Sequence, residues 1–208
     1  EPGAKVTLYQ SGDCSGAVVG EADADAATGA WAYPIGVEDN SENAYYGTAT
    51  DLAGNVSECS PDPLIFIHDT VAPDAPVITH TSPGSPASLL EPLAVGTAEP
   101  FVTITFHLTA DCSDENVGTA TSNGGGEFSG AATVQQNKTN LIYAKAIDGA
   151  ENESGCSLPV TYAHDDTQPS LPTLLGTNPA SPSNASTSPE VFGTSDPGSY
   201  IKLFTVPG

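Results

Sequence analysis

The sequence contains no arginine, and its four lysines stand against 26 acidic residues, so the 208-residue chain has a formal net charge of −22. Nucleic-acid binding is excluded, because contacts to phosphate backbones need clustered cations. Anionic membrane surfaces are disfavoured for the same reason. Apolar runs stay short, as at residues 63–67, well below the roughly 18 residues of a membrane-spanning helix. No secretory signal pattern opens the chain. We therefore expect no membrane insertion in this segment.

Strong helix-forming stretches are also scarce. Methionine is absent, and 21 glycines with 18 prolines interrupt the chain throughout. Such a composition is typical of an all-β or a disordered chain. Because composition alone does not separate these two classes, the pattern along the sequence decides between them.

An internal repeat with a period of about 97 residues runs through the whole chain. Glu1-Pro2 recurs as Glu99-Pro100 and as Asp196-Pro197, spacings of 98 and 97 residues. Within one residue of this offset, Cys14 aligns with Cys112, Trp31 with Phe128, Tyr46 with Tyr143, 51–55 with 148–152, Cys59 with Cys156, and His68 with His164. This agreement predicts a tandem array.

Each repeat is long enough to be a whole domain with its own core, because solenoid repeats have only about 20 to 50 residues. We expect a partial unit at 1–72 with strands C to G, a complete unit at 73–169, and a partial unit at 170–208 with strands A to C. Residues 1–9 repeat as 196–204. We therefore expect the chain to be a segment of a longer protein.

Alternating polar and apolar residues between turns predict an antiparallel β-sandwich in the complete unit. The predicted strands A to G are 76–81, 92–98, 101–108, 116–122, 126–134, 141–148 and 158–164. Ile104 and Phe106 lie two apart on strand C and are expected to face the core, with Phe128 as the central aromatic residue. The matching core positions of the partial units are Val6, Leu8, Trp31, Ile201 and Leu203. Tyr46 and Tyr143 either form a tyrosine corner or pack in the core.

Several short motifs occur in the same order along the repeats. They are Gly-Thr-Ala-Glu-Pro at 96–100, Asp-Leu-Ala-Gly-Asn at 51–55, Asp-Thr-Val-Ala-Pro at 69–73, and an aromatic residue on strand E. In these residues the chain resembles the bacterial immunoglobulin-like (BIg) tandem repeats of large surface and adhesin proteins, over essentially its whole length. Its cysteines resemble the cysteine-bearing subtype. The complete unit departs from the pattern at Asp114 and Glu151, where the first unit has glycine.

This resemblance implies tandem immunoglobulin-like, seven-stranded antiparallel β-sandwiches at an extracellular or cell-surface location. It also implies calcium ions at the junctions between units. Ca²⁺ takes six to eight oxygen ligands, and acidic residues gather where one unit ends and the next begins. The candidate ligands are Asp69, Asp74, Glu99, Asp148, Asn152, Asp165, Asp166 and Asp196. In the alternative interpretation these residues form turns on a solvated acidic surface.

The four cysteines form an even, repeated set, which in an extracellular chain predicts disulfides. No Cys-x-x-Cys is present, so zinc is not expected. Two pairings are compatible with the sequence. Bonds within units would be Cys14–Cys59 and Cys112–Cys156. Strand parity instead places Cys112 and Cys156 at opposite ends of a domain roughly 20 Å long, which favours Cys14–Cys156 across the junction.

Catalysis is not expected. The four histidines fall in strands or linkers without a spaced metal partner, and no Gly-x-Ser-x-Gly, His-Glu-x-x-His or phosphate-binding loop occurs. His68 and His164 recur beside a linker aspartate, which indicates a structural contact.

The expected function is a structural stalk or spacer in a long extracellular, adhesin-like surface protein. The Pro-rich linkers at 71–76 and 167–172 favour an extended rod. One alternative is part of a filament or fibre with disulfide-stapled repeats. A carbohydrate-binding module is weaker, because the single tryptophan is expected in the core. The expected partners are neighbouring repeats, other copies in a fibre, or a host receptor bound through domains outside this segment.

Overall fold

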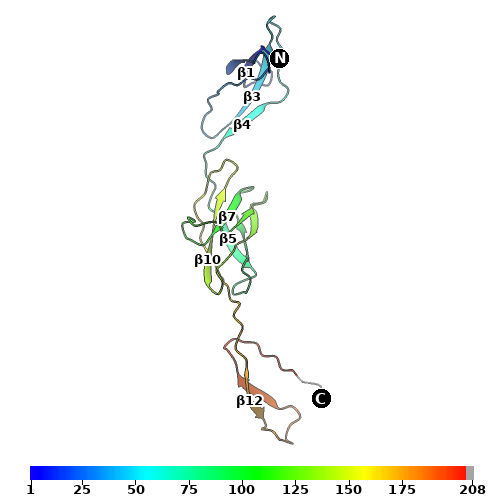
Figure 1. Cartoon of the computed structure of the whole chain (residues 1–208), viewed down its shortest axis with the longest axis vertical. Coiled ribbons are helices and arrows are strands. Elements are labelled where there is room, and N and C mark those ends of the chain that lie inside the picture. Colours follow the sequence, from blue (N-terminus) through cyan, green and yellow to red (C-terminus); the bar gives the residue numbers. More distant parts are fainter. Residues whose placement is uncertain (205–208) are drawn as a thin grey trace.

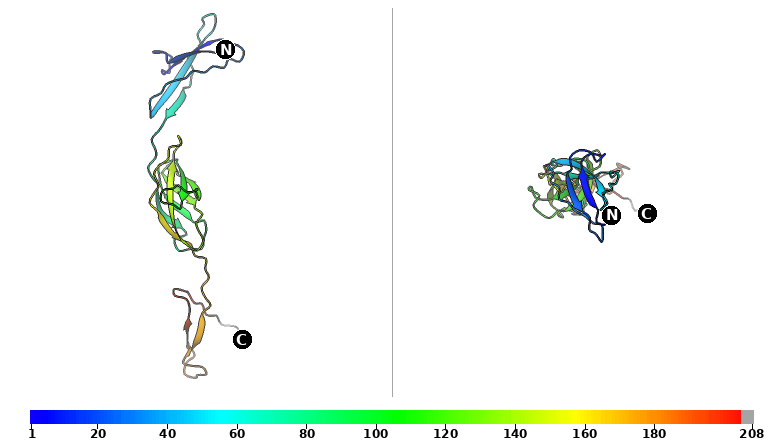
Figure 2. Two further views of the ribbon diagram at one scale, coloured as in Figure 1. Left: turned by 60° about the vertical axis from the view of Figure 1, so that its left-hand side comes forward. Right: turned by 90° about the horizontal axis from the view of Figure 1, so that it is seen from above.

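The computed structural model describes residues 1–204, and these form strands and loops without an α-helix. Three bodies follow one another in a row, so the molecule is long and narrow (Figures 1 and 2). Each sheet lies within 1–72, 73–169 or 170–204, called units one, two and three below. All strand pairs within the sheets are antiparallel, which confirms the predicted all-β class. No helix within the described part could cross a membrane. Residues 205–208 of the predicted third unit lie outside it.

Unit two is a sandwich of two sheets. Its strands are β5 (Val77–Ser82), β6 (Leu93–Thr97), β7 (Thr103–His107), β8 (Gly118–Thr121), β9 (Glu127–Ala131), β10 (Thr139–Ile147) and β11 (Val160–Ala163). One sheet has the order β5-β6-β9 and the other β11-β10-β7-β8. Every segment predicted as a strand in this unit overlaps one of these strands.

The core of unit two lies between its two sheets. Ile104 and Phe106 of β7 are completely buried, and Phe128 of β9 is 3% exposed, as predicted. The rings of Phe106 and Phe128 lie 6.1 Å apart between centroids. A Cβ atom on Gly96 of β6 would come within 2.7 Å of the Phe128 ring and 2.1 Å of the Val77 carbonyl oxygen. Gly96 therefore provides the space that the central aromatic ring occupies.

Unit one has only one sheet in the described structure. Its strands are β1 (Lys5–Tyr9), β2 (Gly20–Asp23), β3 (Ser41–Thr50) and β4 (Leu64–His68), in the order β2-β1-β3-β4. This order matches that of β8-β7-β10-β11 in unit two. The prediction of a buried Trp31 was wrong, because its side chain is 45% exposed. Residues 1–72 contain no equivalent of β5 and β6 to cover it.

Unit three consists of the hairpin β12 (Thr173–Asn178) and β13 (Glu190–Thr194) with the loops around it. Ile201 and Leu203 were predicted to face a core from strand C. They are 43% and 63% exposed and lie outside the strands. Their exposure has the same cause as that of Trp31. Residues 170–204 contain no strand equivalent to β10 with which Ile201 and Leu203 could pair.

The tyrosine corner does not form. Within residues 1–204, neither the Tyr46 nor the Tyr143 hydroxyl donates to a backbone oxygen, and both residues lie inside long strands. Core packing does not describe them either, because Ile142 and Ala144 of the core cluster flank Tyr143, which places Tyr143 on the other face of β10, and Tyr46 is half-buried. Tyr162 of β11, which the sequence did not single out, is completely buried and its hydroxyl donates to the Leu89 carbonyl oxygen at 2.8 Å. This bond ties the last strand of unit two to the loop between β5 and β6.

The close approach at Gly96 generates a first prediction. We expect Gly96→Ala to destabilise unit two by about 1–3 kcal/mol, because the added methyl group would overlap backbone as well as a ring. Hydrogen exchange of the β6 and β9 amides, followed by mass spectrometry, measures the loss of protection. Gly149→Ala is the matched control, because a Cβ atom there would meet nothing within 4 Å. Equal protection in the two variants would contradict the prediction.

Candidate functional site: disulfides and junctions

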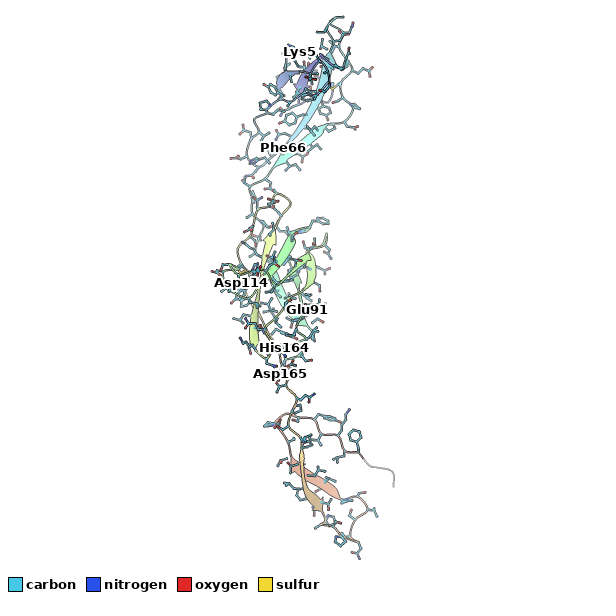
Figure 3. All side chains as sticks on the ribbon, in the orientation of Figure 1. Lys5, Phe66, Glu91, Asp114, His164 and Asp165 are labelled. Carbon is cyan, nitrogen blue, oxygen red and sulfur yellow. A yellow bond between two sulfur atoms is a disulfide. The ribbon has the colours of Figure 1, made fainter. Side chains whose placement is uncertain are left out.

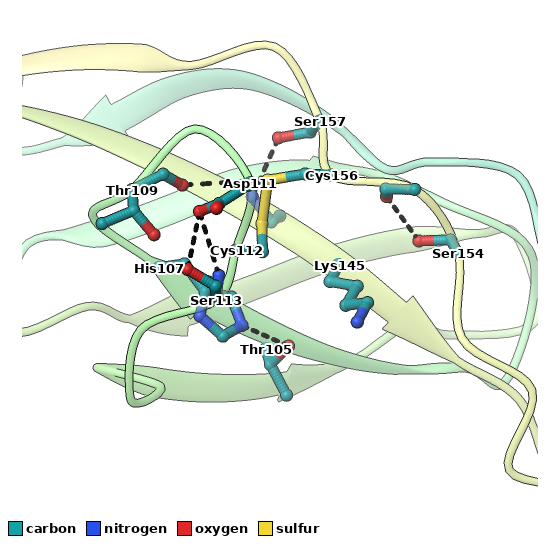
Figure 4. The surroundings of a disulfide bond; sticks show 12 residues. Thr105, His107, Thr109, Asp111, Cys112, Ser113, Lys145, Ser154, Cys156 and Ser157 are labelled. Carbon is teal, nitrogen blue, oxygen red and sulfur yellow. Dashed lines mark hydrogen bonds between the residues drawn. A yellow bond between two sulfur atoms is a disulfide. The ribbon is translucent and has the colours of Figure 1, made fainter.

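Both disulfides lie within units. Cys14 bonds to Cys59 with a Cα–Cα distance of 5.6 Å, and Cys112 bonds to Cys156 with 5.8 Å (Figure 4). Of the two pairings left open by the sequence, the structure has the first. The Cys14–Cys156 bond across the junction does not form.

Strand parity pointed to the wrong pairing because the chain after β10 does not stay at the end of the sandwich. It turns back and runs along β10, where the Ser154 amide donates to the Ala146 oxygen at 2.9 Å and the Ser157 amide to the Ala144 oxygen at 2.8 Å. Cys156 lies between these two contacts. On the other side of β10, His107 at the end of β7 pairs with Tyr143. The two cysteines of unit two therefore meet partway along the sheet.

Serine hydroxyls hold this returning segment in place. The Ala146 amide donates to Ser154 Oγ and the Ala144 amide to Ser157 Oγ, both at 2.8 Å. Both alanines are completely buried, so the hydroxyls replace carbonyl acceptors that a regular strand would supply. We call the tetrapeptide Ser154-Gly-Cys-Ser157 a serine clasp.

Unit one contains the same serine clasp at Ser57-Glu-Cys-Ser60. The Ala49 amide donates to Ser57 Oγ at 2.9 Å, and the Gly47 amide donates to Ser60 Oγ at 3.2 Å. The Ser-x-Cys-Ser pattern, present in both repeats, is the signal in the sequence that marks this feature.

The other cysteine of each pair sits in a tight turn. Cys14 and Cys112 have φ angles of 53° and 50°. Asp13 Oδ1 accepts from the Ser15 hydroxyl at 2.7 Å, and Asp111 Oδ1 accepts from the Ser113 hydroxyl at 2.8 Å. Hydrogen bonds from the hydroxyl and then the amide of Ser15 hold the pKa of the Asp13 carboxyl below its ordinary value. The two turns share these contacts but differ at the next position, where Gly16 has a φ of 94° and Asp114 has no positive φ and accepts from the Leu108 amide.

A buried polar network lies beside the disulfide of unit two. His107 is 6% exposed; its Nε2 lies 3.0 Å from Thr105 Oγ1, and its Nδ1 lies 3.1 Å from Asp114 Oδ1 (Figure 4 shows the Thr105 contact). Burial favours a higher pKa for Asp114, but bonds from the Leu108 amide, the Thr109 hydroxyl and His107 hold that pKa below its ordinary value.

The order of hydroxyl, imidazole and carboxylate in this network is also that of hydrolase triads. Here, however, Thr105 is only 9% exposed, so a substrate has little access to its hydroxyl. What the network does is anchor the segment that carries Cys112, because Asp114 Oδ2 accepts from the Leu108 amide at 3.0 Å.

At the first junction, residues from both flanking units contact the linker. The Thr70 amide donates to Asn40 Oδ1 of unit one at 2.7 Å. The Asp74 amide donates to Glu99 Oε1 of unit two at 2.8 Å. Asn152 Nδ2 of unit two also donates to the carbonyl oxygen of Asp69 at 3.2 Å. The linker is thus attached to the unit before it and to the unit after it.

The second junction repeats the two main contacts. The Asp166 amide donates to Asn137 Oδ1 at 3.0 Å, and the Ser170 amide donates to Asp196 Oδ2 at 2.6 Å. The Asn137 amide in turn donates to His164 Nδ1 at 3.0 Å, at the end of unit two where Figure 3 labels His164 and Asp165. His68 accepts the Asn40 amide in the same way at 3.2 Å. Both recurring histidines therefore make structural contacts.

Five of the eight candidate calcium ligands use a carboxylate oxygen to accept a backbone amide: Asp69, Glu99, Asp148, Asp165 and Asp196. Asp148 Oδ1 accepts from the Ala150 and Asn152 amides at 2.8 and 2.9 Å. The Asn152 side chain is the main cause that holds the pKa of Asp148 below its ordinary value. Asp69 and Asp165 accept from amides two residues further on, those of Val71 and Thr167.

Within residues 1–204, no three Asp, Glu, His or Cys side chains come together in a way that could hold a metal ion. Calcium at the junctions stays a prediction, and an ion there would have to replace several of the amide donors.

The Asp148–Asn152 loop keeps its shape despite the departure at Glu151. Asp51 Oδ1 accepts from the Ala53 and Asn55 amides at 2.9 and 2.8 Å, as Asp148 does in unit two. Gly54 has a φ of 87° and Glu151 a φ of 67°, so the glutamate adopts a left-handed conformation that favours glycine.

No protein-family model matches the chain, and no curated protein matches it. One similar solved structure is described as "Biofilm associated protein - BSP domain", with 14% sequence identity and a TM-score of 0.33. The match covers 79% of this chain and 25% of that chain. A similarity at this level carries no argument about function. The resemblance to BIg repeats therefore rests on the residues that carry it.

The serine clasp leads to a second prediction. We expect Ser157→Ala to destabilise unit two by about 1–3 kcal/mol, because the buried Ala144 amide loses its acceptor. Exchange protection of the β10 amides measures the effect. Ser129→Ala, at an exposed position of β9, is the control. An unchanged exchange rate at Ala144 would show that the hydroxyl is dispensable.

Removing the disulfide of unit two is the third prediction. Cys112→Ala with Cys156→Ala opens a bond between residues 44 apart in sequence. Because a disulfide limits the freedom of the unfolded chain, we expect a loss of about 2–4 kcal/mol, measured by urea denaturation. The same change at Cys14 and Cys59 should leave the exchange protection of unit two intact. Loss of protection in both units from either change would contradict bonds confined to single units.

Proposed function

We propose that this chain is a run of tandem β-sandwich repeats that acts as a spacer in an extracellular surface protein and provides reach and stiffness. The observation that carries the proposal is the repeated construction of the junctions. In both, an asparagine of the preceding unit accepts the amide of the residue just before the linker, and an acidic residue of the following unit accepts an amide within the linker. These residues are Asn40 with Glu99 and Asn137 with Asp196.

A linker attached at both of its ends resists bending better than a free one. Within the linkers, Pro73, Pro76, Pro169 and Pro172 fix their own φ angles, which limits the remaining freedom. The net charge of −22 adds repulsion along the rod and supports solubility. These features together favour the extended arrangement seen in Figure 2.

An extracellular location is supported by the two disulfides, because disulfides persist in oxidising compartments. In the fibre alternative, disulfides would link neighbouring units. Both disulfides instead lie within units, so they do not support this alternative. Stiffness at the junctions then has to come from hydrogen bonds and proline.

Small-angle scattering of the 208-residue chain, coupled to size exclusion to isolate single molecules, tests the spacer function. We expect the double variant Asn137→Ala/Asp196→Ala to lower the radius of gyration, because the second linker loses both attachments. Asn184→Ala, an exposed asparagine in a loop of unit three, is the control. An unchanged radius in the double variant would contradict the proposal.

The same experiment in EDTA separates the two explanations of stiffness. Amide-based attachments predict no change on chelation. Shortening of the unaltered chain in EDTA would instead support calcium at the junctions.

A further inference from the structure

The loop between β8 and β9 of unit two carries a reactive pair of residues. Among the ten asparagines of the chain, Asn123 alone is followed by glycine. The backbone nitrogen of the following residue can attack Cγ of an asparagine side chain and close a five-membered ring. Glycine favours this attack, because it has no Cβ atom to crowd the nitrogen and its backbone rotates freely. Residues 123–125 are exposed, so water reaches the pair.

The folded loop holds the Asn123 side chain in one orientation. Its Oδ1 accepts from the Gly125 amide at 2.9 Å and from the Glu127 amide at 3.0 Å. Its Nδ2 donates to Glu127 Oε2 at 3.2 Å. Because an amide oxygen only accepts and an amide nitrogen only donates, these contacts distinguish the two atoms. The oxygen therefore faces two backbone donors, and the nitrogen faces a carboxylate.

The two backbone donors favour attack at Cγ. Negative charge develops on Oδ1 when a nucleophile adds to Cγ, and N–H groups aimed at such an oxygen stabilise that charge. The attacking nitrogen is also available. Within residues 1–204, the Gly124 amide donates to no acceptor, whereas the amides of Gly125, Gly126 and Glu127 all donate within the loop.

We propose that Asn123 modifies itself in the folded protein and becomes aspartate or isoaspartate. The Gly124 nitrogen gives its proton to water and forms a bond to Asn123 Cγ. The bond from Cγ to Nδ2 then breaks, and Nδ2 takes up a proton and leaves as ammonia. Water opens the succinimide ring at either of its two carbonyl carbons, which gives the two products. The sequence of steps needs only water as a reactant.

Two other loops have the same construction with the chemical groups exchanged. Asp51 and Asp148 each accept backbone amides from two and four residues further on. Each also accepts from an asparagine side chain at the fourth residue, Asn55 or Asn152. In these loops the carboxylate comes first and the amide side chain second. The loop at 123–127 has the reverse order, which places the amide next to a glycine.

The exchange decides which loop reacts. Asp148 is also followed by a glycine, Gly149. Hydrogen bonds from the Asn152 side chain and from backbone amides hold the pKa of Asp148 below its ordinary value, so this side chain is an ionised carboxylate at neutral pH. An ionised carboxylate resists nucleophilic attack, whereas the neutral amide of Asn123 does not.

The modification changes the turn that joins β8 to β9. Aspartate at position 123 loses the donor to Glu127 and sets two carboxylates against each other. Isoaspartate adds a methylene group to the backbone between two turn bonds, from the Asn123 amide to the Glu127 oxygen and from the Gly126 amide to the Asn123 oxygen, both at 2.9 Å. Ser122, the residue before this turn, donates to the Glu99 carbonyl oxygen at 2.5 Å. The change therefore occurs next to the residue that holds the first linker.

Peptide mapping by mass spectrometry, on the 208-residue chain kept folded at neutral pH, tests the proposal. We expect the peptide with position 123 to become heavier by about one dalton with time, because a hydroxyl group replaces an amino group. The other nine asparagines should stay unaltered over the same period. A higher pH should speed the change, because the attacking nitrogen has to lose its proton.

Gly124→Ala is the variant that tests the attacking residue. The nearest atoms to a Cβ there belong to the exposed Phe101 ring, at 3.1 Å, so the ring can move aside and the loop can keep its fold. We expect this variant to lose the mass increase. Gly36→Ala is the matched control, because a Cβ atom there would meet nothing within 4 Å, and it should react like the unaltered chain.

The same chain unfolded in urea provides the second reference, because it keeps the sequence and lacks the loop contacts. The folded chain should react at least as fast as the unfolded one. If Asn123 stays unaltered in the folded chain and reacts in urea, the fold protects the side chain and the proposal is overturned. A mass increase that survives Gly124→Ala would also overturn it. The inference goes beyond the spacer function, and neither result alters the scattering prediction for the second junction.

Discussion

The structure depends on one constraint, which is that a sheet with an apolar face has to cover that face with another layer. Unit two satisfies it with two sheets, and Phe106 and Phe128 are buried between them. Unit one carries one layer and unit three carries two strands of the other. The same repeat position is therefore buried as Phe128 and exposed as Trp31, although both residues are large and aromatic. Burial here is set by which strands are present, more than by the residue itself.

The strands and core of unit two could be predicted because alternation and repeat spacing are local signals. Ile104 and Phe106 needed only their period of two. The exposure of Trp31 could not be predicted in this way, since it depends on strands that residues 1–72 do not contain. The disulfide pairing also escaped prediction, because strand parity assumes that connecting segments stay at the ends of the sandwich. The serine hydroxyls of residues 154–157 allow the segment to lie along β10 instead.

The junctions show a different limit of sequence reasoning. Acidic and amide residues were expected there, and Glu99, Asn152 and Asp196 do contact the linkers. Their chemistry was less predictable, because a carboxylate oxygen can accept an amide hydrogen bond or bind Ca²⁺. Which of the two it does depends on the positions of the neighbouring atoms. Asn40 and Asn137 were missed because asparagine in a turn is common. The signal in the sequence was that Asn40 and Asn137 lie one repeat apart, as His68 and His164 do.

The position of each disulfide bears on how the repeats are divided. The Cys112–Cys156 bond encloses β8, β9 and β10 and ties the segment after β7 to the segment after β10, while β5 and β6 lie outside the closed loop. In unit one the equivalent Cys14–Cys59 bond encloses β2 and β3 of a four-stranded sheet. A sheet stapled in this way does not need the β5–β6 hairpin for its own connectivity.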